Sequence, residues 1–210
     1  DHNPRWRRGF DKMQRQPQRM TLLANDLLLL SRLENEGLKS KRQHIAMRPF
    51  LQQIYDDASV FNTDHAHRIG LSIESDMDLL GSEKEIASAF VNLVTNAIKY
   101  TPKGGVIELR WSDDGKNGYF SVTDNGIGIE AHHVPRLTER FYRVDSGRSR
   151  ETGGTGLGLA IVKHVLHQHD AYLDIQSTLG KGSRFSCVFP ASRLVPHSPG
   201  QTPQLASKSA

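Results

Sequence analysis

Two glycine motifs within one polar stretch constrain the fold of this chain more than any other feature. The first, Asp124-x-Gly126-x-Gly128, follows a predicted strand at 119–123, and the second, Gly154-Thr155-Gly156-Leu157-Gly158-Leu159, opens a predicted helix at 159–168. Glycines at the start of a helix leave backbone N–H groups unshielded, which suits an anionic phosphate. An acidic side chain just after a strand can accept a hydrogen bond from a ring amino group. We therefore predict a nucleotide site with a mobile flap between the two glycine corners.

Other nucleotide motifs fit this stretch less well. Gly126-x-Gly128-x-x-Ala131 also matches the dinucleotide fingerprint, with Asp145 near the place of its ribose acid. That fingerprint needs a short apolar helix and a second strand, whereas residues 130–150 are charged and contain Pro135. The P-loop is excluded because the chain has no Gly-Lys-Ser/Thr. Ordinary turn glycines remain an alternative for either motif alone, but the two together argue against it.

The composition limits the class of protein. The chain has 210 residues, of which 37% are hydrophobic and 24% charged, with a net charge of +4. This length allows one soluble globular domain plus an appendage, and no apolar run is long enough to span a bilayer. Arginines gather early without interleaved aromatics, so we expect no direct nucleic-acid binding. The single Cys187 excludes an internal disulfide, which fits a reducing compartment, and no secretory signal opens the chain.

Residues 5–36 are predicted to form one long helix. Met13, Met20 and Leu27 recur at heptad spacing, and further leucines widen the apolar stripe. A lone helix this apolar needs a partner, so we expect it to pack on the main domain or to pair between chains. Residues 38–44 are predicted to be a linker, after which the main domain extends over 45–191.

The main domain shows a mixed order of strands and helices. The predicted elements are a strand at 45–47, a helix from Pro49 to Ala66, strands at 69–74 and 78–81, a helix from Ser82 to Tyr100 opened by a Ser82/Glu85 capping box, a hairpin of 106–112 and 119–123, a helix from Leu159, and strands at 172–177 and 184–190. This order predicts an α/β fold, a two-layer sandwich of a mixed sheet with helices on one face. The tail at 192–210 is rich in Pro, Ser and Gln, and we expect it to be disordered.

Helix 82–100 carries a narrow polar stripe roughly opposite its apolar face. Its members are Glu85, Asn92, Asn96 and Lys99. Asparagine is a poor helix former, so two of them here indicate a function. A carboxamide oxygen can ligate Mg²⁺ that already holds phosphate oxygens, a lysine can neutralise phosphate charge, and Tyr100 is placed to lie against a base. An ordinary solvated face is the alternative.

These residues resemble the N, G1, F and G2 boxes of sensor histidine kinases, in order and in spacing. The matching segments are Asn92-x-x-x-Asn96, Asp124-x-Gly126-x-Gly128, Arg140-Phe141-Tyr142-Arg143 and Gly154-x-Gly156-x-Gly158. The helix at 5–36 resembles the second helix of that family's dimerisation and phosphoacceptor hairpin, so that residues 1–37 would be part of it. Residues 137–145 resemble the branch of the family that serves the phosphate regulon.

The resemblance implies an ATP-binding sandwich of the type shared with type II topoisomerases, the Hsp90 chaperone and mismatch-repair ATPases. By position, Asn96 would coordinate Mg²⁺ with help from Asn92, and Asp124 would accept a hydrogen bond from the adenine amino group. Lys99 and Arg143 would meet the phosphates and, with Asn92, act in catalysis. The other residues that the resemblance assigns to ATP are Tyr100, Gly126, Gly128, Ile129, Phe141, Gly154, Thr155, Gly156, Leu157, Gly158 and Leu159, with Ser183 near the adenine.

The phosphoacceptor departs from the family pattern. It is a histidine followed by Glu or Asp and then by Pro, and none of the ten histidines has that context. We therefore expect a fragment that begins after the phosphoacceptor helix, binds Mg-ATP and does not phosphorylate itself. Seven of the histidines are expected at the surface, and a metal site is not favoured. They are His65, His67, His132, His133, His164, His167 and His169.

The implied function is transfer of the γ-phosphoryl group of Mg-ATP to a histidine, for relay to an aspartate of a response regulator in phosphate-starvation signalling. The protein would be a homodimer through its helix hairpin and the cytoplasmic part of a bacterial inner-membrane protein, reaching the membrane only through upstream segments. Two alternatives remain. One is a stand-alone ATPase of the same superfamily in which Glu85 activates water, and the other is a non-catalytic nucleotide-binding module.

Overall fold

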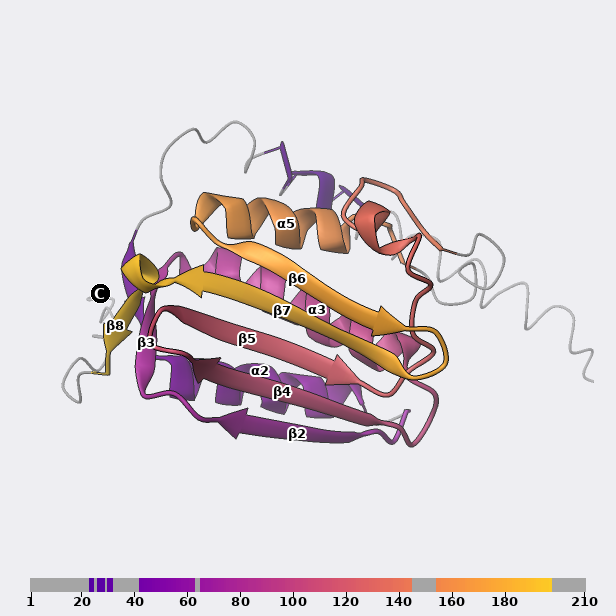
Figure 1. Ribbon diagram of the computed structural model, residues 1–210, viewed down its shortest axis with the longest axis horizontal. Coiled ribbons are helices and arrows are strands. Elements are labelled where there is room, and N and C mark those ends of the chain that lie inside the picture. The colour runs from indigo at the N-terminus through magenta and orange to yellow at the C-terminus, as the bar shows by residue number, and fades with distance from the viewer. Residues whose placement is uncertain are drawn as a thin grey trace, which may run out of the picture.

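The computed structural model describes residues 23–24, 26–28, 30–31, 42–62, 65–144 and 154–197 (Figure 1). Its elements in chain order are β1 (Gln43–Ile45), α2 (Met47–Phe61), β2 (Arg68–Ile73), β3 (Met77–Gly81), α3 (Glu83–Tyr100), β4 (Val106–Asp113), β5 (Asn117–Asp124), the 3₁₀ helix η1 (Val134–Arg136), α5 (Gly158–Gln168), β6 (Tyr172–Thr178), β7 (Gly182–Pro190), the 3₁₀ helix η2 (Ala191–Arg193) and β8 (Leu194–Pro196). Most of the helix predicted at 5–36 lies outside the described residues, and the described residues between 23 and 31 are helical.

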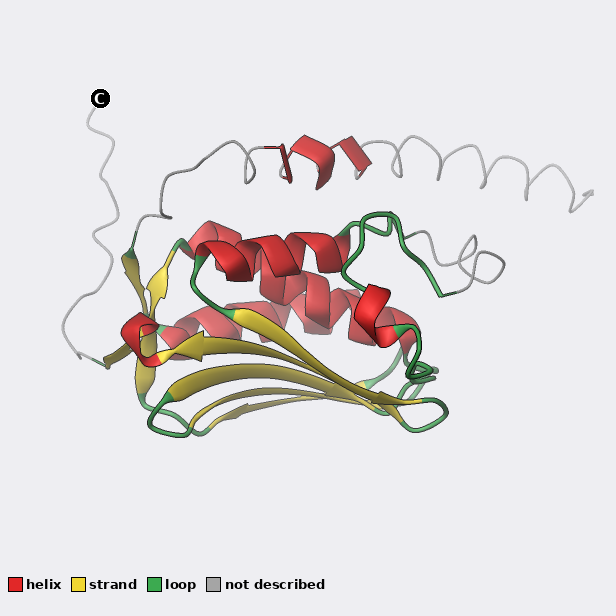
Figure 2. Ribbon diagram, turned by 45° about the horizontal axis from the view of Figure 1, so that its top comes forward, coloured by secondary structure: helices red, strands yellow, loops and turns green. Residues whose placement is uncertain are grey.

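A five-stranded sheet forms one layer, in the order β2-β4-β5-β7-β6. β2 and β4 are parallel, and the other neighbours are antiparallel. The helices α2, α3 and α5 all cover the same face of this sheet (Figure 2). The prediction of a mixed sheet with helices on one face is therefore confirmed. Period-two alternation explains the inner face, because alternate residues of β4 (Ile107, Leu109 and Trp111) are fully buried.

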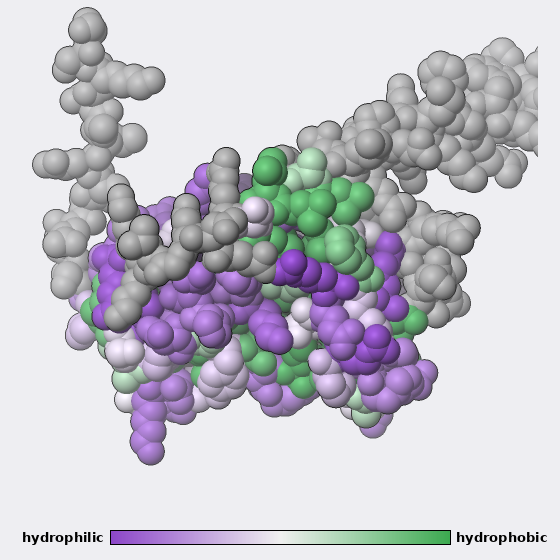
Figure 3. Space-filling view, turned by 90° about the horizontal axis from the view of Figure 1, so that it is seen from above, coloured by the Kyte–Doolittle hydropathy of each residue, from purple (hydrophilic) through white to green (hydrophobic). Residues whose placement is uncertain are grey.

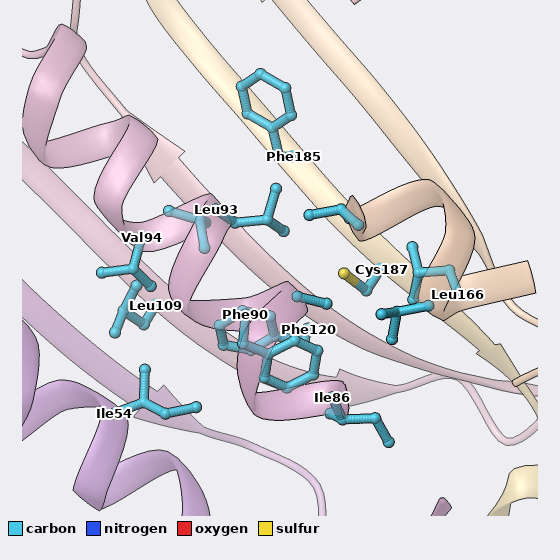
Figure 4. Packing of buried hydrophobic residues seen from close by; sticks show 14 of the residues in the cluster. Ile54, Ile86, Phe90, Leu93, Val94, Leu109, Phe120, Leu166, Phe185 and Cys187 are labelled. Carbon is cyan, nitrogen blue, oxygen red and sulfur yellow. The ribbon is translucent and has the colours of Figure 1, made fainter. Parts of the chain in front are cut away.

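Aromatic rings join the helix layer to the sheet. Phe90 of α3 stacks on Phe120 of β5, with ring centroids 3.8 Å apart, and meets Phe189 of β7 edge-on. Leu166 of α5 and Cys187 of β7 continue the same buried cluster (Figure 4). This packing holds α3 and α5 side by side over the sheet, so their polar faces meet at one end.

The C-terminal segment is ordered further than predicted. A second sheet of order β1-β3-β8 includes β8, whose Leu194 pairs with Leu79. The tail at 192–210 was predicted to be disordered, and this prediction is wrong for residues 192–197. Arg193 is buried there and donates to the backbone carbonyls of Leu80 and Gln168. The amino-acid composition of a segment carries no information on partners that are distant in the sequence. Residues 198–210 lie outside the described part of the chain.

Two predicted element boundaries around α2 are wrong. The strand predicted at 45–47 ends at Ile45, since Met47 begins α2 and donates its backbone N–H to Asp78 Oδ1 over 2.9 Å. This buried carboxylate replaces an N-cap side chain and starts the helix before Pro49, which is tolerated in a first turn. α2 ends at Phe61 rather than at Ala66, whose φ of 53° is left-handed.

The capping box predicted for α3 is also wrong. Ser82 is the N-cap residue, but its side chain makes no cap hydrogen bond. Its backbone N–H donates instead to Nε2 of His169, over 3.0 Å, and Glu85 Oε2 lies 3.8 Å from the same nitrogen. His169 is fully buried and His67 is nearly so, which corrects the expectation that both are surface residues.

Candidate nucleotide site

The polar stripe of α3 faces the glycine ladder that opens α5. A Cβ atom added at Gly158 would lie 2.6 Å from Asn92 Oδ1, and one added at Gly154 would overlap Lys99 Nζ. The amide of Asn92 is oriented by its own donation to the carbonyl of Ser88, over 2.9 Å. The absence of side chains at these two glycines therefore lets Asn92 and Lys99 lie directly against the ladder.

Asp124, at the end of β5, forms the first glycine corner. Its Oδ1 accepts the backbone N–H of Gly126 over 2.8 Å, and the side chain is buried. Burial raises the pKa of this carboxyl, while hydrogen bonds from the backbone of Gly126 and Ser183 lower it. The backbone N–H of Ile127 donates to the carbonyl of Tyr100, over 3.2 Å, which attaches the loop to the end of α3.

Gly128 turns the chain beneath the β6–β7 turn. Its φ is +65°, and a Cβ atom there would collide with the carbonyl of Thr178. The next residue, Ile129, donates its N–H to Ser177 Oγ over 2.8 Å, and Ser177 Oγ lies 2.9 Å from Ser183 Oγ. In the sheet Ser183 pairs directly with Asp124, so the serine pair links both sides of this corner.

The residues before the flap return to the ladder. Arg143 Nη1 donates to the carbonyl of Gly154 over 2.6 Å, and the backbone N–H of Phe141 donates to the carbonyl of Gly156 over 2.9 Å. Burial raises the pKa of the Tyr100 hydroxyl, and the charge of Arg143 lowers it. Lys99 Nζ lies 4.9 Å from the centre of the Tyr100 ring. Two cations and one aromatic ring therefore gather at Gly154.

Sequence reasoning missed His133 and Arg136 as supports of this segment. His133 Nδ1 lies 2.6 Å from the hydroxyl of Tyr142, and the Arg136 guanidinium lies 4.2 Å from the centre of the Tyr142 ring. Tyr142 directly precedes Arg143, so these contacts hold the chain in place next to the arginine. The position of Tyr142 within the F-box segment was the available signal, but its partners follow from the fold of the 131–142 loop.

Five of the remaining predicted residues differ in exposure and in what they contact. Asn96 lies one turn beyond Asn92, is half-buried and, among the described residues, makes no side-chain hydrogen bond. Phe141 is 57% exposed with a φ of 62°, and its backbone rather than its ring contacts the ladder. Leu157 is fully buried, and Ile129 and Leu159 pack against the core, so these three support the site from below.

Two further features lie apart from this arrangement. Glu85 faces the buried His169, two turns before Asn92, so the structure does not favour it as a base that activates water at the ladder. An open concavity of about 520 Å³ lies beside the Gly128 corner and shares only Ile129 with the predicted site. Its lining residues are Ile129, Glu130, Ala131, His132, Ser177, Thr178 and Leu179.

The layered fold and the glycine corners define a class of ATPase. Residues 81–193 match the family described as "Histidine kinase-, DNA gyrase B-, and HSP90-like ATPase", and the chain belongs to that family. Within it, the chain is the ATP-binding catalytic domain of a sensor histidine kinase.

Two relatives are similar to this chain over most of its length. The chain is 50% identical over 194 residues to the phosphate regulon sensor protein PhoR of Pseudomonas aeruginosa, covering 92% of this chain and 44% of that protein. It is 41% identical over 188 residues to the PhoR protein of Haemophilus influenzae, covering 90% and 44%. The chain thus spans less than half the length of these relatives.

A solved structure agrees with the fold. Full-length ShkA in complex with AMPPNP superposes with a TM-score of 0.75 at 25% identity, covering 91% of this chain and 39% of that chain. In the described part of this chain, no helix combines the length and apolar character that crossing a membrane requires.

Proposed function

We propose that this chain is the part of a sensor kinase that binds Mg-ATP and directs its γ-phosphoryl group to a histidine, for relay to a response-regulator aspartate in phosphate-starvation signalling. One observation carries the proposal: Lys99 and Arg143 meet at Gly154 while Asn92 meets Gly158. Cations and carboxamides around a glycine ladder at a helix N-terminus suit a magnesium-bound triphosphate. The names of the PhoR relatives support the signalling pathway.

The adenine end of the site would be formed by Asp124. Its buried carboxylate would accept from the adenine amino group, as a directed hydrogen bond in a low-dielectric setting. Gly126 and Gly128 keep the loop beside it free of side chains, and Tyr100 would flank the ring. The complex of ShkA with AMPPNP supports a nucleotide in this fold.

The phosphate end fits a divalent cation. The carboxamide oxygens of Asn96 and Asn92 are hard ligands, and the amide of Asn96 makes no competing hydrogen bond among the described residues. These two residues would hold Mg²⁺, which offsets phosphate charge when bound. Lys99 and Arg143 would neutralise the remaining charge, and N–H groups of the ladder would cradle the oxygens.

Catalysis would consist mainly of positioning and charge neutralisation. A neutral imidazole nitrogen attacks the γ-phosphorus, the bond to the β-phosphate oxygen breaks, ADP leaves and the imidazole loses its proton. None of the ten histidines has the family's phosphoacceptor context, so the acceptor would be a histidine outside this sequence. We propose that residues 1–37 are part of a dimerising helix hairpin and that the domain works on the cytoplasmic side of a membrane sensor, where ATP is available.

Two substitutions test the roles by calorimetry with Mg-ADP and Mg-ATP. Asp124→Asn should weaken both nucleotides about tenfold or more, because each carries adenine and a hydrogen bond to a charged group is lost. Arg143→Ala should weaken ATP more than ADP, because its guanidinium would meet the terminal phosphate. Equal losses for ATP and ADP in Arg143→Ala would contradict its role, and failure of the unaltered chain to bind either nucleotide would refute the function.

A further inference from the structure

A residue outside the ATPase family match reaches the phosphate ladder. Thr155 donates its hydroxyl to Oδ2 of Asp26 over 2.9 Å, although the two residues are 129 positions apart. The same hydroxyl oxygen accepts the backbone N–H of Leu157 over 3.2 Å. Asp26 is thus connected through one hydroxyl to an N–H group of the ladder itself.

Helix packing brings Asp26 to this place. Leu30 is only 3% exposed within the hydrophobic core, and Leu23 packs against that core. Asp26 lies three residues after Leu23 and four before Leu30, so all three share one helix face. The described residues between 23 and 31 lie alongside the loop that leads into α5 (Figure 2).

Exposure increases away from the docked face of this short helical piece. Leu27, at the edge of that face, is 46% exposed, and Leu28, on the opposite face, is 58% exposed. Viewed from above, apolar atoms gather in one patch of a largely hydrophilic side (Figure 3). The Asp26 contact is therefore part of the face that docks on the ATPase domain.

The contact between Asp26 and Thr155 disfavours the binding of a triphosphate at the ladder. A half-buried carboxylate next to Thr155 places negative charge beside a ladder that would otherwise attract phosphate. Burial raises the pKa of Asp26, and the hydrogen bond from Thr155 lowers it. In addition, the Leu157 N–H is directed to the Thr155 oxygen and so is not presented to an oxygen of the nucleotide.

We propose that Asp26 is a positioning residue that acts through Thr155 to lower the affinity of the ladder for ATP relative to ADP whenever residues 23–31 are docked. This inference rests on the proposed function, because it assumes that the ladder holds phosphate. Coupling between two sites is reciprocal, so ATP would in turn weaken the docking of the helix.

Calorimetry on the full chain tests the charge. Asp26→Asn keeps an oxygen that can accept from Thr155 but removes the charge, so Mg-ATP should bind about fivefold tighter or more, with Mg-ADP changed by less than about twofold. Asp57→Asn, on the exposed surface of α2, is the matched control and should change neither affinity. Unchanged or weaker ATP binding in Asp26→Asn would overturn the inference.

The link through Thr155 needs a second test. Thr155→Val removes the hydroxyl at nearly the same side-chain volume, and it should raise the affinity for Mg-ATP relative to that for Mg-ADP, as Asp26→Asn does. In the Thr155→Val background, Asp26→Asn should add little, since the two changes break one link. If the effects of the two substitutions on the affinity for Mg-ATP were fully additive, the link through Thr155 would be contradicted. If the unaltered chain binds neither nucleotide, the proposed function fails; if it binds both and Asp26→Asn has no effect, only this inference fails.

Discussion

Asp124 combines two opposing demands in one side chain. At the end of β5 the carboxylate accepts backbone N–H groups of Gly126 and Ser183, which favour its charged form, and in the proposed function it also accepts from adenine. Burial, however, makes its ionised form less stable in the folded protein than in water, which is why its pKa is raised. A group with such a conflict between stability and binding is typical of a functional site.

Replacing Asp124 by Asn should therefore separate stability from binding. Because the folded-state pKa is raised, the native carboxyl holds its proton more tightly, and stability falls as pH rises through the window above 3.8. Without ligand at pH 7, Asp124→Asn should melt at an unchanged temperature or up to about 4 °C higher, even though nucleotide binding weakens. Scanning calorimetry of both proteins measures this, and a clearly lower melting temperature would contradict it.

Burial lowers the pKa of His169, whereas it raises the pKa of Asp124, because the charged form of histidine is the protonated one. Desolvation lowers its pKa, the carbonyl of Val165 lies 2.7 Å from Nδ1, and Nε2 accepts from Ser82, so the native ring is neutral. Between the folded-state pKa and the ordinary histidine pKa of 6.5, the unfolded chain binds more protons than the native protein. Its contribution to stability is complete above that window and is lost as pH falls.

The pH dependence of unfolding tests this assignment. Urea titrations between about pH 7.5 and 5.5 should show stability declining with acidification in the unaltered chain. His169→Gln keeps an acceptor but does not titrate, so it should be less stable overall with a flatter decline. His132→Gln, at an exposed histidine, should retain the full decline. An equally steep decline in His169→Gln would argue against a neutral buried ring.

The loop from β5 toward η1 depends on local backbone conformation as well as on packing. Gly128 and Gly104 both have positive φ, +65° and +79°. A Cβ atom at Gly128 would strike the carbonyl of Thr178, whereas nothing lies within 4 Å of one at Gly104. The first corner is therefore held by contact with the β6–β7 turn.

Matched alanine substitutions separate the two causes. Gly104→Ala should cost about 1 kcal/mol, since only the left-handed backbone opposes it. Gly128→Ala should cost more than about 3 kcal/mol and weaken nucleotide binding, because the loop must also move away from Thr178. Urea unfolding and calorimetry give both quantities. Similar costs at the two positions would show that the Thr178 contact is unimportant.

Arg193 ties the small sheet to the helix layer of the whole domain. Its guanidinium donates to the carbonyls of Leu80 and Gln168, and to Asp170 Oδ2 over 2.9 Å. The carbonyl of Gln168 is at the end of α5, where a cation also suits the helix dipole. One side chain therefore sets how β3, η2 and α5 meet.

Two arginines that contact the same carboxylate permit a controlled test. Arg42 Nη2 lies 4.0 Å from Asp170 on the surface, while Arg193 is buried. Arg193→Met should lower the free energy of unfolding by about 2–4 kcal/mol, because two carbonyls lose their donor. Arg42→Met should change it by less than about 1 kcal/mol, as exposed ion pairs do. Equal effects would contradict this role of Arg193.

Much of this architecture could be predicted because its signals are local. Alternation predicted β4 and β5, the helical spacing of apolar residues predicted α3, and the glycine motifs located both corners. The proximity of Asn92 and Lys99 to the ladder also agrees with their spacing along the chain, which reflects one helix face and one helix start, while their role in binding a nucleotide stays a prediction. Boundaries failed where a distant group intervened, as at Met47, which Asp78 caps.

The sequence alone determined the order of elements, the buried faces and the family, because backbone geometry imposes short repeats on neighbouring residues. It did not determine which remote side chains complete each element. His169 replaces the expected cap of α3 from 87 positions away, and Asp26 reaches Thr155 across 129. Those partners depend on how separately formed segments pack, and only the folded arrangement brings them within hydrogen-bond distance.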